Sequence, residues 1–129
     1  MTPGTVVVLD GSAVLALLYR EPGERLVRDL LSGSYVSTVN WSEIRQKVAQ
    51  QGGDPATADY LVALGVGIES FTQVDAAVAA EFFQVTRGAG LALGDCACLA
   101  LAKRRQATAV TADLAWTMID TGIPVFAVR

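Results

Sequence analysis

The sequence predicts a single domain with an α/β fold and a parallel sheet, and three observations lead to this prediction. Short β-branched apolar runs alternate with longer segments of helical periodicity along all 129 residues. Hydrophobic residues make up 52% of the chain and charged residues 18%, which is typical of a sheet buried on both faces by helices. The chain has no internal repeat, low-complexity tract or linker. We therefore expect a single domain over residues 1–129.

The amino-terminal segment predicts a buried strand and a short helix. Val6–Leu9 is a β-branched apolar run, and Asp10-Gly11 ends it. Ser12 can cap the helix that follows, which we expect to reach Tyr19. A further helix follows Pro22, with an apolar stripe at helical spacing formed by Leu26, Val27, Leu30 and Leu31.

The middle of the chain predicts a brief strand and two helices. Ser32-Gly33 stops the preceding helix, and Tyr35-Val36 forms the strand. Asn40 opens the next helix, which Gly52-Gly53 closes. Its inner face includes Ile44 and Val48. Asp54-Pro55 then starts a helix with the usual order of cap and proline, and this helix ends near residues 65–67.

The carboxyl-terminal half continues the alternation. Ile68–Phe71 is a weaker strand candidate, and residues 74–87 predict a helix. One face of that helix is formed by Val74, Val78, Phe82 and Val85. Asp95 introduces Cys96–Ala102, which is apolar all round and therefore predicts a central buried helix. The last expected elements are a strand at Ala107–Val110, a short helix at Asp113–Ile119 and a strand at Pro124–Val128.

Composition and the two cysteines exclude several classes of protein. No apolar run reaches the roughly 18 residues that cross a bilayer, and Met1–Thr5 shows no signal-peptide pattern, so we expect a cytoplasmic protein with no membrane partner. On one helix, Cys96 and Cys98 would point in different directions, which disfavours a disulfide between them. Two thiols without any histidine also cannot complete a zinc site. We expect both to be buried apolar fillers.

The net charge of −3 argues against a general nucleic-acid coat protein. Three basic clusters could nevertheless hold a phosphate backbone, although a solvated helix face is the favoured interpretation of each one taken singly. They are Arg20, Arg25 and Arg28; Arg45 and Lys47; and Lys103 to Arg105.

Four acidic residues stand where a strand ends or a helix begins: Asp10, Glu43, Asp95 and Asp113. In a parallel sheet these points converge on one rim, outside the carboxyl ends of the strands. Carboxylates crowded there repel one another unless a cation lies among them. Hard oxygen ligands without histidine suit Mg²⁺ or Mn²⁺ better than zinc. The sequence therefore predicts a metal-dependent phosphodiesterase site, and no histidine exists to serve as the base of a nucleophilic serine.

Each acid also has a structural interpretation. Asp10 could end a strand beside a turn glycine, Asp95 and Asp113 could cap helices, and Glu43 stands at capping-box distance from Asn40. The polar neighbours Ser12, Asn40 and Thr111 could cap or form turns, or could orient the carboxylates around an ion. The two kinds of role are compatible.

Four short motifs, in order along the chain, resemble the PIN domain, specifically bacterial VapC-type toxins. They are Val-Leu-Asp10-Gly-Ser12-Ala; Val-Asn40-Trp-Ser-Glu43; Leu-Gly-Asp95-Cys-Ala-Cys-Leu-Ala-Leu-Ala; and Val-Thr111-Ala-Asp113-Leu-Ala-Trp116. The resemblance extends from Val6 to the carboxyl end. Two positions depart from the pattern: Gly11 replaces a more usual small or hydroxylated residue, and Cys96 stands where arginine is frequent.

The resemblance implies a three-layer sandwich with a twisted, parallel five-stranded sheet flanked by helices. It implies a Mg²⁺- or Mn²⁺-dependent endoribonuclease that acts on cellular RNA as the toxin of a type II toxin–antitoxin (VapBC) system. It also implies a homodimer inhibited by a cognate VapB-type antitoxin. In the roles it implies, Asp10 and Asp95 are the principal metal ligands, and Glu43 contacts the metal directly or through water. Asp113 completes the site or holds a second ion, and Ser12, Asn40 and Thr111 support these acids.

Two other functions remain open from the sequence. A catalytically silent module of the same fold would bind RNA or protein without cleaving, and the presence of all four acids disfavours it. A small-molecule phosphatase with Asp10 as covalent nucleophile would need a second acid two positions later, where Ser12 stands.

Overall fold

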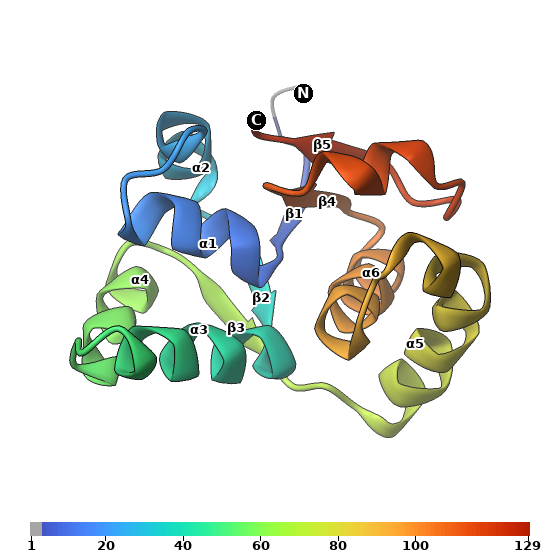
Figure 1. Ribbon diagram of the computed structural model, residues 1–129, viewed down its shortest axis with the longest axis horizontal. Helices are drawn as coiled ribbons and strands as arrows, with labels where there is room; N and C mark the ends of the chain where they lie inside the picture. Colours follow the sequence, from blue (N-terminus) through green and yellow to red (C-terminus); the bar gives the residue numbers. More distant parts are fainter. Residues whose placement is uncertain (1–3) are drawn as a thin grey trace.

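Helices cover both faces of one parallel sheet in the computed structural model, which describes residues 4–129 (Figure 1). Within these residues the sheet has five strands in the order β3-β2-β1-β4-β5. The strands are β1 Val7–Leu9, β2 Tyr35–Ser37, β3 Gly67–Glu69, β4 Thr108–Thr111 and β5 Val125–Ala127. The predicted three-layer α/β sandwich is confirmed. Residues 1–3 of the segment considered for a signal peptide lie outside the described part.

The helices follow the sequence prediction closely, with differences at their ends. The α-helices are α1 Gly11–Leu18, α2 Glu24–Leu30, α3 Thr38–Gln50, α4 Tyr60–Ala63, α5 Gln73–Thr86 and α6 Leu93–Arg105. Short 3₁₀ helices are η1 Pro55–Asp59, η2 Arg87–Ala89 and η3 Leu114–Met118. The helix expected after Asp54-Pro55 is therefore η1 followed by α4, and the short helix expected at Asp113–Ile119 is η3. No helix in residues 4–129 has both the length and the apolar character required to cross a membrane.

Two of the predicted helix caps are wrong. The N-cap of α1 is Asp10, whose carboxylate accepts a hydrogen bond from the backbone N–H of Ala13, and Ser12 lies inside the helix. Helix α3 begins two residues before Asn40, because the hydroxyl of Ser37 accepts from the N–H of Val39 and caps it there. The capping-box interpretation of Asn40 and Glu43 is thereby removed, and Asn40 becomes a buried residue of the first turn.

Alternation along β1 divides the core into two clusters, one on each face of the sheet. Val7 and Leu9 pack into the cluster covered by α1 to α4, whereas Val8 packs into the cluster covered by α5 and α6. Figure 1 shows these two helical layers on opposite sides of the central strands. Helix α6 is the predicted central helix, since every residue from Cys96 to Ala102 is buried. Cys96 and Cys98 are buried and unpaired, as expected.

The predicted inner face of α5 is correct in its middle and wrong at its two ends. Phe82 is buried and Val78 packs against the core, whereas Val74 is 68% exposed and Val85 is 57% exposed. The other buried positions are Asp75, Ala79 and Thr86. Polar residues tolerate this burial because Asp75 is hydrogen-bonded by Arg104 and Thr86 donates to the carbonyl of Phe82.

The strand order places a topological switch point beside β1. From β1 the chain proceeds to β2 and β3 on one side, then crosses over to β4 and β5 on the other. The two neighbours of β1 are thus β2 and β4, both parallel to it. Ligands of open parallel α/β sheets bind in the crevice outside the carboxyl ends of the strands at such a point. Asp10 follows β1 there, and Asp113 follows β4.

Candidate functional site

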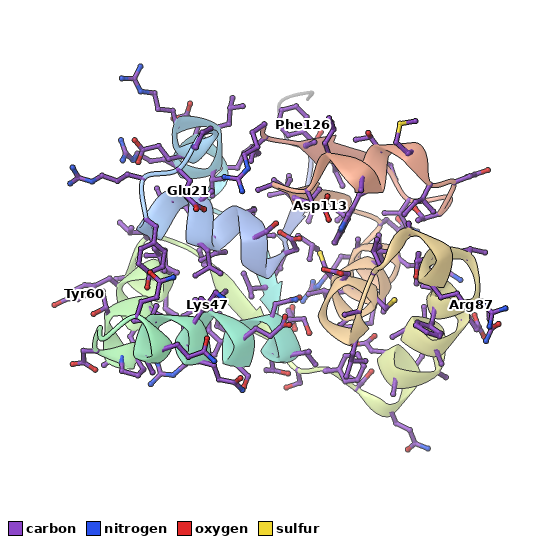
Figure 2. The ribbon with its side chains drawn as sticks, in the orientation of Figure 1. Glu21, Lys47, Tyr60, Arg87, Asp113 and Phe126 are labelled. Atoms are coloured by element: carbon purple, nitrogen blue, oxygen red, sulfur yellow. The ribbon has the colours of Figure 1, made fainter. Side chains whose placement is uncertain are left out.

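All four predicted acids line one pocket at the carboxyl edge of the sheet. Its volume is about 350 Å³. The acids reach it from the N-cap of α1, the second turn of α3, the first turn of α6 and the segment after β4: Asp10, Glu43, Asp95 and Asp113. The remaining lining residues are Gly11, Ser12, Leu15, Gln46, Lys47 and Gln50. Figure 2 shows Asp113 near the centre of the molecule, between the helical layers.

Asp10 is the most buried of the four and is held by a dense set of hydrogen bonds. Its Oδ1 accepts from the backbone N–H of Ala13 at 2.9 Å and from the hydroxyl of Ser12 at 2.8 Å. Its Oδ2 accepts from the hydroxyl of Thr111 at 2.8 Å. The hydroxyl of Ser12 also accepts from the N–H of Ala112, which ties α1 to the end of β4. These contacts fix the carboxylate rigidly at the switch point.

Burial makes Asp10 a weaker acid than usual. Loss of solvation raises its pKa from 3.8 to about 6, although the hydrogen bonds from Ala13, Ser12 and Thr111 favour the charged form. The negative charge of Asp95 adds to the rise. The ionised carboxylate therefore lacks a compensating positive charge among its neighbours, which is the condition under which a bound cation is most favourable.

Glu43 is directed toward the start of α6. Its Oε1 accepts a hydrogen bond of 3.0 Å from Nδ2 of Asn40, which also donates to the carbonyl of Gly94 at 2.9 Å. A Cβ atom on Gly94 would overlap the Glu43 carboxylate, so only glycine leaves room for it there. Buried Oδ1 of Asn40 has no hydrogen-bond partner among the described residues. Asn40 thus orients Glu43 and anchors α3 to α6.

Asp95 and Asp113 each use one carboxylate oxygen in a cap. Oδ2 of Asp95 accepts from the N–H of Ala92 at 2.9 Å, and Oδ1 of Asp113 accepts from the N–H of Ala115 at 3.0 Å. The second oxygen of each has no such bond to a described residue. The structural interpretation of these acids is therefore correct, and it is compatible with ligand binding because each cap leaves one oxygen available.

Electrostatic coupling links the acids to one another. Partial burial raises the pKa of Asp95, a hydrogen bond from Ala92 opposes the rise, and the charge of Asp113 adds to it. Burial raises the pKa of the Cys98 thiol well above its ordinary value, and three carboxylates of the pocket add to the rise: Asp10, Asp95 and Glu43. In the described residues, however, no three acidic or thiol side chains converge closely enough to form a ready-made metal cage.

The basic clusters separate into two groups. Five arginines form ion pairs: Arg28 with Glu24, Arg45 with Asp59, Arg104 with Asp75, Arg105 with Glu69 and Arg129 with Glu21. Among the described residues, Lys47 is the one basic side chain that lines the pocket. From sequence, Lys47 was predicted only as a member of a basic cluster with Arg45, without a connection to the acids. Its position four residues after Glu43, one helical turn along α3, was the available signal.

Comparison with solved structures finds close similarity of fold. A toxin–antitoxin complex from Klebsiella pneumoniae matches with a TM-score of 0.75 at 18% identity, covering 95% of this chain and 98% of that chain. DNA-bound VapBC from Salmonella typhimurium matches with a TM-score of 0.75 at 14% identity, covering 97% and 99%. VapC20 from Mycobacterium tuberculosis, described as a sarcin–ricin loop cleaving toxin, matches with a TM-score of 0.70 at 16% identity, covering 87% and 93%.

Sequence comparison assigns the family. No curated protein matches the chain closely enough to count as a relative. The family model of the PIN domain matches residues 7–121, which include all four acids of the pocket and every strand except β5. Because this match spans most of the sequence, the chain belongs to the PIN domain family.

Proposed function

We propose that this protein is the toxin component of a type II toxin–antitoxin system and acts as a metal-dependent endoribonuclease. The observation that carries the proposal is the shared pocket of four carboxylates at the switch point of the sheet. Membership of the PIN family and similarity of fold to VapBC toxins, one of them described as cleaving the sarcin–ricin loop, support it. We further propose that the whole chain, 1–129, is one PIN domain that works in the cytoplasm.

The donor set fits a hard divalent cation. All four candidate ligands are carboxylates, and the chain has no histidine. Asn40, whose amide orients Glu43, also carries a buried Oδ1 that has no hydrogen-bond partner among the described residues. Mg²⁺ keeps several waters, so carboxylates that share a pocket without touching can hold it partly through water. Bound Mg²⁺ or Mn²⁺ would acidify a coordinated water and neutralise charge on the phosphate.

The residues of the pocket then take distinct roles. Asp10 and Asp95 are the proposed principal metal ligands, with Glu43 and Asp113 completing the site. Ser12 and Thr111 hold the Asp10 carboxylate in one orientation through their hydroxyl groups. Asn40 does the same for Glu43 through its amide. Each supporting residue also joins two elements, so orientation of the carboxylates is built into the packing.

The proposed partners follow from the same family resemblance. A cognate VapB-type antitoxin would inhibit the enzyme, RNA would be the substrate, and the toxin would be a homodimer. The solved toxin–antitoxin complexes of the same fold support an antitoxin partner. A gene for a small DNA-binding protein beside the gene for this chain is the corresponding genomic expectation.

The decisive test is RNA cleavage with Mg²⁺ or Mn²⁺ by the wild-type protein and by Asp10→Asn and Asp95→Asn. We expect each substitution to lower the cleavage rate by about a hundredfold or more, because a ligand charge is lost without a change of shape. Asp54→Asn is the matched control, because Asp54 is an exposed N-cap that does not line the pocket. Equal rates in all four proteins would refute the assignment. If the proteins bind RNA and none of the four cleaves it, the chain would instead be a catalytically silent PIN module.

A further inference from the structure

We propose that Lys47 binds a backbone phosphate of the RNA next to the cleaved bond, and that the groove between α1 and α3 carries the strand away from the carboxylates. The inference rests on the proposed function and specifies how its substrate lies. It starts from the shape of the pocket, which extends past the acids to Leu15 on α1 and Gln50 on α3. Figure 2 shows Lys47 on α3, close to α1.

A polar stripe on α3 leads from the acids along this groove. Glu43, Lys47 and Gln50 stand at helical spacing, and all three line the pocket together with Gln46. Lys47 lies about 6 Å further along the helix axis than Glu43, given a rise of about 1.5 Å per residue. A strand whose cleaved phosphate lies among the acids would therefore present a neighbouring phosphate to the Lys47 ammonium group.

Lys47 is available for this contact because its expected partner is directed elsewhere. A glutamate four residues before a lysine ordinarily pairs with it on a helix. Here the Glu43 carboxylate accepts from Asn40 and fits against Gly94, on the side of α6. No described carboxylate lies within ion-pairing distance of Lys47. Its positive charge is exposed at the pocket wall without an internal ion pair.

The charge balance of the pocket makes such a cation useful. Four carboxylates line it, and the chain carries a net charge of −3, so an approaching phosphodiester meets repulsion that a cation in the wall reduces. The neighbouring Arg45 does not serve this purpose, because it pairs with Asp59 at 2.9 Å. The cavity, at about 350 Å³, has the size of a small-ligand site.

The chain supplies a matched control, since Lys47 and Lys103 are its two lysines. Lys103 is exposed near the end of α6 and does not line the pocket. We would measure binding of a short fluorescein-labelled single-stranded RNA by anisotropy, in Ca²⁺ to occupy oxygen ligands, between about 50 and 200 mM salt. The proteins are the wild type, Lys47→Gln, Lys47→Arg and Lys103→Gln, and cleavage by the same proteins is followed in Mg²⁺.

We expect Lys47→Gln to weaken RNA binding about fivefold at low salt, the effect of one exposed ion pair. The slope of log K against log salt should fall by about 0.7, because one single-strand phosphate contact is lost. Lys47→Arg should restore binding and slope, and Lys103→Gln should match the wild type. In cleavage, Lys47→Gln should raise KM with kcat nearly unchanged, as expected for lost binding that is equal in ground and transition states.

Three results would overturn the inference: identical salt slopes for the two glutamine variants, failure of arginine to rescue, or no RNA binding by the wild type. A wild type that binds RNA with the expected Lys47 dependence but cleaves nothing would refute the proposed enzyme activity alone. The two proposals therefore fail on different measurements.

Discussion

Asp10 is 2% exposed, and both of its oxygens accept hydrogen bonds from residues that belong to other parts of the chain or to the first turn of α1. The same carboxylate caps α1 and lines the acidic pocket. Its position after a buried strand was sufficient to predict, from sequence, that it lies at the carboxyl edge of the sheet, where the pocket is. The hydrogen bond that Asp10 accepts from Thr111 could not be predicted from the sequence, because the two residues meet only through the pairing of β1 with β4.

The raised pKa of Asp10 predicts a conflict between stability and function. Since the folded value of about 6 lies above the ordinary 3.8, the ionised form destabilises the metal-free fold above pH 6. This penalty shrinks as the pH falls and is gone below the ordinary value. Asp10→Asn should therefore raise the free energy of unfolding near pH 7 by up to roughly 2 to 3 kcal/mol, with no gain near pH 4.

Urea unfolding with a metal chelator, for wild type and Asp10→Asn at several pH values, measures this difference. A variant that is less stable than wild type near pH 7 would contradict the prediction. It would show that the hydrogen bonds to the carboxylate outweigh its loss of solvation.

At the scale of elements, the ion pair of Asp75 and Arg104 joins the start of α5 to the end of α6. Arg104 donates to both carboxylate oxygens, at 3.0 and 3.1 Å, and its Nη2 also donates to the carbonyl of Ser70. Asp75 in turn completes a capping box with Thr72. Sequence periodicity alone could not predict this arrangement, since it assigns an acidic residue to the solvent side. The partner that permits its burial stands 29 positions later.

The ion pair of Asp75 and Arg104 predicts how the free energy of unfolding changes in acid. Burial by itself would raise the pKa of Asp75, but the hydrogen bonds and charge of Arg104 and the bonds from Thr72 lower it below 3.8. The pair therefore stabilises the fold above about pH 4, and its contribution is lost as the pH falls through the lowered value. Arg104→Gln should cost about 1 to 2 kcal/mol near pH 7, a moderate figure because the arginine is 35% exposed.

Chemical denaturation of Arg104→Gln and of Lys103→Gln, near pH 7 and again near pH 3, separates the contribution of the ion pair from that of packing. Lys103 lies beside Arg104 on α6 and forms no ion pair with a described residue, so its substitution should be nearly neutral at both pH values. A loss for Arg104→Gln that stayed constant with pH would show that the arginine acts through packing.

At the scale of the whole molecule, the convergence of the acids is a consequence of topology. Parallel strands bring their carboxyl ends to one edge, so acids at strand ends could be predicted to meet from the order of elements alone. The fold class and the placement of the pocket were predictable for that reason. The direction of Glu43 toward α6 was not, because it depends on Asn40 and on the missing side chain of Gly94.

The four carboxylates that share one pocket predict that divalent metal stabilises the entire fold. A ligand that binds only the folded state adds about 1.4 kcal/mol at ten times its Kd, which raises the Tm of a domain of this size by about 5 °C. Differential scanning fluorimetry with millimolar Mg²⁺ should show this shift for wild type. The double variant Asp10→Asn/Asp95→Asn should show none, and NaCl of equal ionic strength serves as the control. No shift in the wild type would count against a pocket formed before the metal binds.

Three aspartates of the pocket each accept a backbone hydrogen bond at the start of a helix. Asp10 and Asp113 are N-caps, where asparagine replaces aspartate almost without loss and alanine costs about 1 kcal/mol. Asp95 is the third residue of a capping box, a position where an amide oxygen can accept the same backbone bond. A single substitution of aspartate by asparagine in a descendant of this protein can therefore remove a pocket carboxylate and still leave the fold intact. Genome surveys of pseudoenzymes in this lineage should find asparagine, more often than alanine, at positions 10, 95 and 113.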